Sequence, residues 1–137
     1  MEKESRMVPP KTEPQGDQAL YDLIDRTIQR EGRFPGDMTL FLGGMLISGT
    51  PISEQEFFAR LEQMSRRTDQ QELAEVGRET QEEHGGDGNY IHLKNARVFG
   101  VGPVQMIPLW RGQLSEVKGW YAGWATATGE QYGVYAT

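Results

Sequence analysis

Two strand-like stretches, the first of them punctuated by glycines, constrain the fold of this chain more than any other feature. The first covers residues 38–49, the second covers residues 90–97, and a shorter apolar block follows at 109–114. Alternating apolar side chains in these stretches are typical of strands with one buried face. Residues 65–89, between the two, contain few apolar residues and many acidic ones. The chain must therefore build its sheet from strands that an acidic segment separates.

Local signals predict a helix and then a tight hairpin in the first half of the chain. Asp17 can cap a helix that stops at Gly32. The apolar stripe of this helix, at helical spacing, is Leu20, Leu23, Ile24 and Ile28. Gly43 and Gly44 then permit the positive φ angles of a hairpin between strands 38–42 and 45–48.

A second helix has a well-marked start. Ser53 and Glu56 have the spacing of a capping box, and Ile52 and Phe57 that of a hydrophobic staple. The acidic stretch 65–89 can continue as a solvated helix to about Gln81, with a glycine at position 77 as its weak point.

The second half of the chain reads as short strands. Ile91 and Leu93 share one face, but Ala96 and Val98 fall on the opposite parity, which predicts a bulge near Asn95. Further short strands are expected at 106–109, 113–117 and 120–124, with a turn at 100–103.

These elements predict an α+β fold: a small, strongly curved antiparallel sheet or an SH3/Sm-like barrel. It has an N-terminal helix and a helix inserted between strands 2 and 3. We expect one globular domain over residues 17–124, in which 65–89 is an acidic, solvated helix or loop insertion. Residues 1–16, with three prolines among charged side chains, are expected to form a disordered leader. Residues 125–137 form an aromatic tail rich in Gly, Ala and Thr.

Composition narrows the classes of function. The chain has no cysteine, which suits a reducing compartment, so a cytoplasmic location is expected. It lacks an apolar run long enough to span a membrane. The net charge of −6 opposes general binding to phosphate backbones, so a nucleic acid is not the expected partner.

The sequence offers no constellation of catalytic, cofactor-binding or metal-binding residues. Its two histidines, His84 and His92, lack the spacing of known metal motifs. His92 shares its strand parity with Tyr90 and Lys94, so we expect it to be a solvent-facing polar residue. No nucleophile elbow or phosphate-binding loop is present. We therefore expect a non-enzymatic protein without a cofactor or metal.

Five residues are candidates for an interaction surface: Trp110, Arg111, Trp120, Tyr121 and Trp124. Trp and Arg are enriched at binding hot spots, and charge-poor aromatic segments tend to bind a partner or self-associate. Two alternatives stay open. Trp110 can be a core or barrel-end residue with Arg111 outside, and 120–124 can be the closing strand of the domain. The open strand edges and the aromatic tail predict a homo-oligomer.

The order of the motifs resembles the gas vesicle accessory protein U family over residues 36–123. The resemblance rests on the strand–Gly–Gly–strand block ending at Ser48-Gly49, the helix that begins near 56–58, the block 90–97, the block 109–114 and the segment 117–119. It implies a non-enzymatic accessory role in gas vesicle assembly or regulation. That role would act through contacts with gas vesicle proteins, and the protein would associate with gas vesicles in the cytoplasm.

A second resemblance is architectural. The strand order and the Arg111-Gly112 pair look like an Sm-like barrel, in which such an Arg-Gly pair contributes to RNA binding and edge strands pair into rings. The chain lacks the Asp and Asn expected after the second strand of that fold. An Sm-like RNA-binding or ring-forming module is therefore the alternative function.

Overall fold

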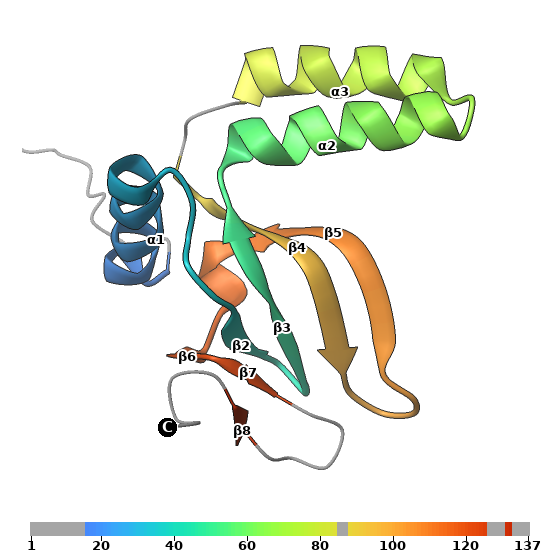
Figure 1. The fold of residues 1–137 in the computed structure, drawn as a ribbon. Coiled ribbons are helices and arrows are strands. Elements are labelled where there is room, and N and C mark those ends of the chain that lie inside the picture. The colour runs from blue at the N-terminus through green and yellow to red at the C-terminus, as the bar shows by residue number, and fades with distance from the viewer. Residues whose placement is uncertain (1–15, 85–87, 126–130, 133–137) are drawn as a thin grey trace, which may run out of the picture.

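A computed structural model describes residues 16–84, 88–125 and 131–132, and shows three α-helices around one main sheet (Figure 1). The helices are α1 (Gln18–Glu31), α2 (Glu54–Arg67) and α3 (Gln71–His84). The strands of the main sheet are β2 (Met38–Leu42), β3 (Met45–Ile52), β4 (Tyr90–Phe99), β5 (Gln105–Gln113) and β6 (Gly119–Ala122). A 3₁₀ turn, η1 (Leu114–Glu116), precedes β6, and β7 (Trp124–Ala125) pairs with β8 (Gln131–Tyr132).

The five-stranded sheet is antiparallel throughout, in the order β5-β4-β3-β2-β6. The α+β class, the N-terminal helix and the antiparallel sheet are therefore confirmed. The barrel is not confirmed, because the sheet is not closed: β5 and β6 form its two edges. The last strand of the sheet nevertheless lies beside the first, since β6 pairs with β2.

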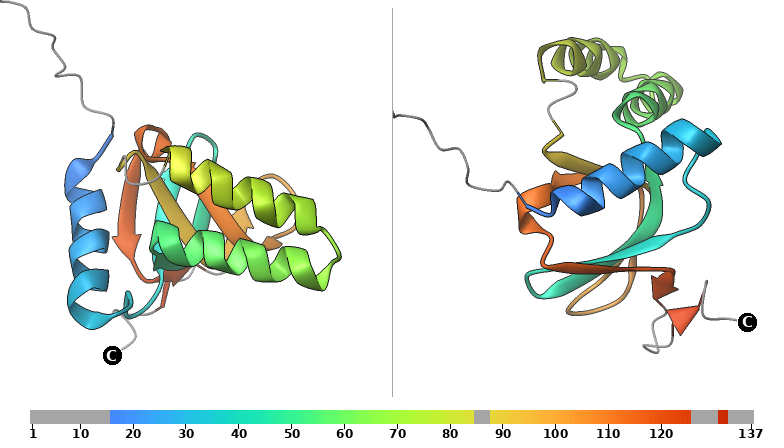
Figure 2. Two further views of the ribbon diagram at one scale, coloured as in Figure 1. Left: turned by 90° about the horizontal axis from the view of Figure 1, so that it is seen from above. Right: turned by 90° about the vertical axis from the view of Figure 1, so that its left-hand side faces the viewer.

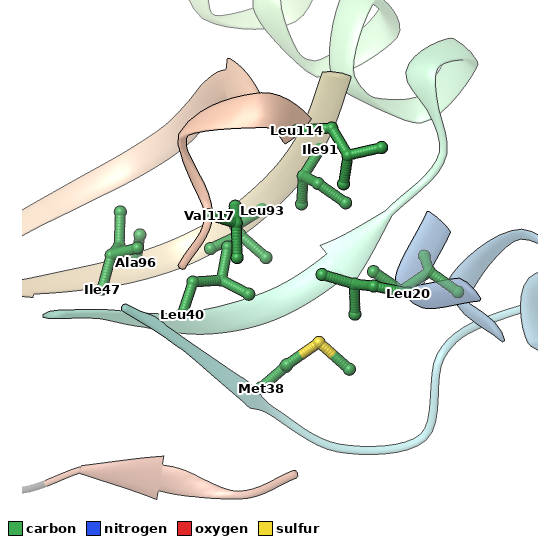
Figure 3. Packing of buried hydrophobic residues seen from close by; sticks show 10 residues of the cluster. Leu20, Met38, Leu40, Ile47, Ile91, Leu93, Ala96, Leu114 and Val117 are labelled. Carbon is green, nitrogen blue, oxygen red and sulfur yellow. The ribbon is translucent and has the colours of Figure 1, made fainter. Parts of the chain in front are cut away.

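One face of the curved sheet holds the main core, which α1 and η1 help to cover (Figure 3). Its buried members are Leu20, Ile24, Met38, Leu40, Ile47, Ile91, Leu93, Ala96, Leu114 and Val117. They come from α1, three strands and the segment around η1, so the core joins both halves of the sequence. Burial of these side chains supplies most of the driving force for folding.

The insertion between β3 and β4 is a helical hairpin rather than one helix. The helices α2 and α3 lie antiparallel to each other, and the hairpin extends past the sheet (Figures 1 and 2). The chain reverses at residues 68–70, where Asp69 has a φ of 61°. Gly77, expected to weaken a helix, is buried against α2: a Cβ there would lie 3.4 Å from Leu61 Cδ2 and 3.9 Å from Phe58 Cδ1. Both distances are ordinary van der Waals contacts, so the α2–α3 packing leaves room for a Cβ at this position.

The start signals of the helices act largely as predicted. Asp17 Oδ1 accepts a hydrogen bond from the Leu20 amide at 3.0 Å, and Gly32 ends α1 in the left-handed region. Ser53 Oγ accepts from the Glu56 amide at 3.0 Å. The capping box is only half formed, because the Glu56 carboxylate instead accepts from Arg60.

The strand signals give a mixed result. The Gly43-Gly44 hairpin and the bulge are confirmed, and Asn95 takes a φ of 52° where β4 has one residue more than β3. The strand predicted at 113–117 is wrong. That segment contains η1, whose tight turn brings Leu114 and Val117 into the same core. Gly112 does not interrupt β5, and the last predicted strand breaks at Gly123.

A buried polar network attaches β7 to the other face of the sheet. Thr39 Oγ1 lies 2.6 Å from Ser48 Oγ and donates to the Gly123 carbonyl at 2.9 Å. Ser48 Oγ accepts from the Ala125 amide at 3.0 Å. These bonds satisfy the buried hydroxyls and fix the chain after β6 across the outside of β2 and β3.

Candidate interaction site

The outer face of β4 and β5, beneath α2, carries a cluster of aromatic and basic side chains. Arg111 on β5 stands opposite His92 on β4, and its Nε donates to His92 Nε2 at 3.0 Å. The Arg111 guanidinium carbon lies 3.7 Å from the ring centroid of Tyr90 and 5.9 Å from that of Phe58. Cation–π contact of this kind favours a fixed, partly desolvated arginine.

His92 differs from its prediction. It was expected to face solvent, but it is 5% exposed, and its ring lies 4.9 Å from that of Phe57. The alternation along β4 does mark a separate face, yet α2 covers that face. Because Nε2 accepts a hydrogen bond from Arg111, the ring is a neutral imidazole whose proton is on Nδ1. The Nε2 lone pair is therefore occupied by a hydrogen bond within the domain.

A cavity of about 540 Å³ adjoins this cluster, between α1, the start of α2 and the start of β4. Buried side chains of Ile24, Ile52 and Ile91 line it, together with His92. Its remaining lining residues are Tyr21, Asp25, Ile28, Gln29, Ser53, Glu54, Gln55, Gln81, Gly88 and Tyr90. The size is that of a small-ligand or side-chain pocket. Sequence reasoning missed it because α1, α2 and β4 are far apart along the chain.

Trp110 and Arg111 point to opposite faces of β5, as consecutive strand residues must. Trp110 is partly buried against the main core, and its ring covers Gly112. Arg111 lies in the cluster beneath α2. The two residues therefore do not form a single surface patch. The strand register pairs His92 with Arg111, whereas Tyr90 is paired with Gln113 and reaches Arg111 diagonally.

The other three candidates lie on β6 and β7. Trp120 packs against the main core, and its indole Nε1 donates to Asp17 Oδ2 at 3.1 Å. Tyr121 faces the other way, with its ring 5.9 Å from that of Phe41. Trp124 is half-buried on β7. Residues 1–15 of the expected leader, and 126–130 and 133–137 of the tail, lie outside the described residues.

The described geometry limits the chemistry that this region can support. Among the described residues, no group of three or more His, Asp or Glu side chains is placed to hold a metal ion. Within the same part of the chain, no helix is long and apolar enough to cross a membrane. The cluster around Arg111 consists of packed aromatic rings and a hydrogen bond between Arg111 and His92, an arrangement that keeps these side chains in fixed positions.

The structure thus defines a small α+β protein in which a helical hairpin and an N-terminal helix cover one open, curved antiparallel sheet. A family model described as "Gas vesicle protein GvpU-like" matches residues 17–125. The chain belongs to this gas vesicle protein family, as the resemblance over residues 36–123 indicated. Searches of curated proteins and of solved structures give no match.

Proposed function

We propose that this chain is a non-enzymatic accessory protein in gas vesicle assembly or regulation. It acts through contacts with other gas vesicle proteins and through self-association, in the cytoplasm at the vesicles. The observation that carries the proposal is the family match, which covers most of the chain. The contact between Arg111 and His92 supports the non-enzymatic part of the proposal, because the hydrogen bond from Arg111 Nε occupies the Nε2 lone pair that a catalytic base would need.

The surfaces of the sheet support a role in protein contacts. Its two edge strands, β5 and β6, each have only one strand partner within the sheet. Unpaired edges offer backbone groups to another chain. Large apolar side chains are also exposed around the described molecule: Leu23, Phe41, Leu73, Val76, Val101 and Met106.

The proposal assigns the binding role first to Tyr121 and Trp124. Both are half-buried aromatic residues near the β6 edge, and such rings contribute strongly when a partner desolvates them. Trp110, Arg111 and Trp120 stay candidates, with their contacts inside the domain as an additional role.

Co-sedimentation of the full chain with purified gas vesicles tests the proposal, together with pull-down of vesicle proteins. We expect binding that Tyr121→Ala and Trp124→Ala reduce, while the matched change Val101→Ala on an exposed loop leaves it unchanged. Absence of binding in both assays would overturn the proposal. Light scattering, with and without residues 125–137, tests self-association, and a concentration-independent monomer contradicts that part.

The Sm-like alternative stays a prediction. In this structure Arg111 is packed between Tyr90, Phe58 and His92, and the sheet is open. The alternative predicts salt-dependent binding to single-stranded RNA that weakens in Arg111→Ala. A titration without measurable binding at low salt removes it.

A further inference from the structure

A second cavity lies on the other side of the Arg111 cluster, between the second half of α2 and the β4–β5 hairpin. It has a volume of about 400 Å³. We call it the α2–β5 groove. Its lining residues are Arg60, Gln63, Met64, Arg67, Thr68, Asn95, Pro108 and Leu109. Arg60, Met64 and Arg67 are four and three residues apart, so they form one stripe along α2.

The charge of the α2–β5 groove is opposite to that of the chain. The sequence has 20 acidic and 14 basic residues, yet the groove lining contains two arginines and, among the residues that the structure describes, no carboxylate. Arg60 is paired with Glu56 at 2.7 Å. Arg67 is exposed and has no ion-pair partner within the described residues. One full cationic group is therefore available to a ligand.

The groove also offers apolar and hydrogen-bonding surface. Met64 and Leu109 are half-buried and Pro108 is exposed, so a partner side chain can remove apolar area from water there. Asn95, held at a φ of 52° by the bulge, presents an amide that has no partner in the described part of the chain. The groove thus combines an apolar floor with free polar groups.

The strand that forms one wall is an edge of the sheet. β5 is nine residues long and, among the strands that the structure describes, pairs only with β4, so within that part of the chain its other side carries unpaired backbone groups. Pro108 supplies no N–H, which blunts this edge at one position but leaves the remaining positions able to pair. An extended segment could add to β5 while its side chains enter the groove.

We propose that the α2–β5 groove binds an extended, acidic and partly apolar segment of a partner protein, which pairs with β5 and places a carboxylate at Arg67. The inference rests on the proposed function only in that the chain works through protein contacts. It adds the surface used and the chemistry of the segment recognised.

Two other occupants fit less well. A second copy of this chain carries many of its acidic residues on α3, which is helical and already packed on α2, so these cannot pair with a strand edge. RNA would need several clustered cations, but the groove holds two arginines, one of which is already paired, in an acidic molecule.

The test is fluorescence anisotropy with the full chain at low salt, using a labelled short peptide of Glu-Thr-Val-Thr repeats, which places Glu and Val on the same face of an extended segment. The reference peptide replaces each Glu by Lys. We expect the acidic peptide alone to bind, and Arg67→Gln to weaken its binding about threefold to fivefold, as for one charged pair at an exposed site. Arg66→Gln is the matched control, because Arg66 pairs with Glu62 and does not line the groove. Its affinity should stay within about twofold of that of the unmodified chain.

Hydrogen exchange gives a second measurement. Amides of β5 should exchange more slowly in the complex, whereas those of β6, at the opposite edge, should not change. Equal losses in Arg67→Gln and Arg66→Gln, binding of the Lys peptide, or unchanged exchange in β5 would each overturn the proposal. So would displacement of the acidic peptide by oligouridylate, or a dimer that the peptide dissociates, because the groove would then belong to RNA or to a second copy.

Vesicle co-sedimentation separates this inference from the proposed function. If the chain binds vesicles but not the acidic peptide, the groove proposal fails and the accessory role stands. If it binds the peptide through Arg67 but never vesicles, the groove stands and the accessory role fails.

Discussion

Gly112 is the position where the structure makes its sharpest energetic prediction. The Trp110 ring lies over it, so a Cβ at residue 112 would be 2.3 Å from the ring atoms Cη2 and Cζ2. Gly112→Ala must therefore displace a ring that packs against the main core. Overpacking of this kind costs about 1–3 kcal/mol, and we expect the free energy of unfolding to fall by about 2 kcal/mol.

Urea unfolding followed by circular dichroism measures this change, and a double-mutant cycle identifies its cause. In a Trp110→Leu background the ring is absent, so Gly112→Ala should cost less than about 0.5 kcal/mol, and the coupling energy should exceed about 1 kcal/mol. Gly43→Ala is the matched control, because a Cβ there has no neighbour within 4 Å. Equal costs of Gly112→Ala in both backgrounds would refute the placement of Trp110.

Three further changes test other contacts. Asp17→Ala removes both the cap of α1 and the acceptor of the Trp120 indole. The free energy of unfolding, measured in urea, should therefore fall by about 1–2 kcal/mol, and the tryptophan emission should shift. An unchanged free energy of unfolding contradicts these two hydrogen bonds. Ser48→Ala leaves the buried Ala125 amide without its acceptor, so the free energy of unfolding should fall by about 1–3 kcal/mol and the hydrogen exchange of that amide should be faster. An unaltered exchange rate counts against the buried network of Thr39, Ser48 and Ala125. The Val76 side chain is 54% exposed, so Val76→Asn should change the free energy of unfolding, measured by thermal denaturation, by less than about 0.5 kcal/mol. A loss above about 1 kcal/mol would show that Val76 is buried in a contact instead.

Features decided within a few residues of the chain could be predicted from sequence. The cap at Asp17, the stop at Gly32, the Gly43-Gly44 hairpin and the bulge at Asn95 all depend on local hydrogen bonds or φ angles. These signals act whatever the rest of the fold does. The α+β class followed from them, because they delimit helices and strands of the right lengths.

Features decided by tertiary contact could not be predicted in the same way. Strand parity placed His92 with Tyr90 and Lys94 on a polar face, but it could not show that α2 would cover that face. Gly77 has a low helix propensity, yet α3 continues through it, because the helix packs on α2. Residue spacing shows which side chains share a face, and only the fold shows what covers it.

The candidate site shows the same division. Arg111 was selected for its residue type beside a tryptophan, but its contacts with His92, Tyr90 and Phe58 depend on strand register and on α2. The two cavities were invisible to sequence reasoning, because their walls come from segments that are distant in the chain.

The two cavities lie toward opposite ends of α2 and differ in charge. Among the described lining residues, the first has Asp25 and Glu54 and no lysine or arginine, whereas the α2–β5 groove has Arg60 and Arg67 and no carboxylate. The helix dipole favours Glu54 in the first turn and Arg67 in the last. It does not explain Arg60 in the middle of the helix, or the lack of carboxylates from β4 and β5 in the groove. The charge of the groove is therefore a property of the surface that three elements build together, as recognition of an acidic segment requires.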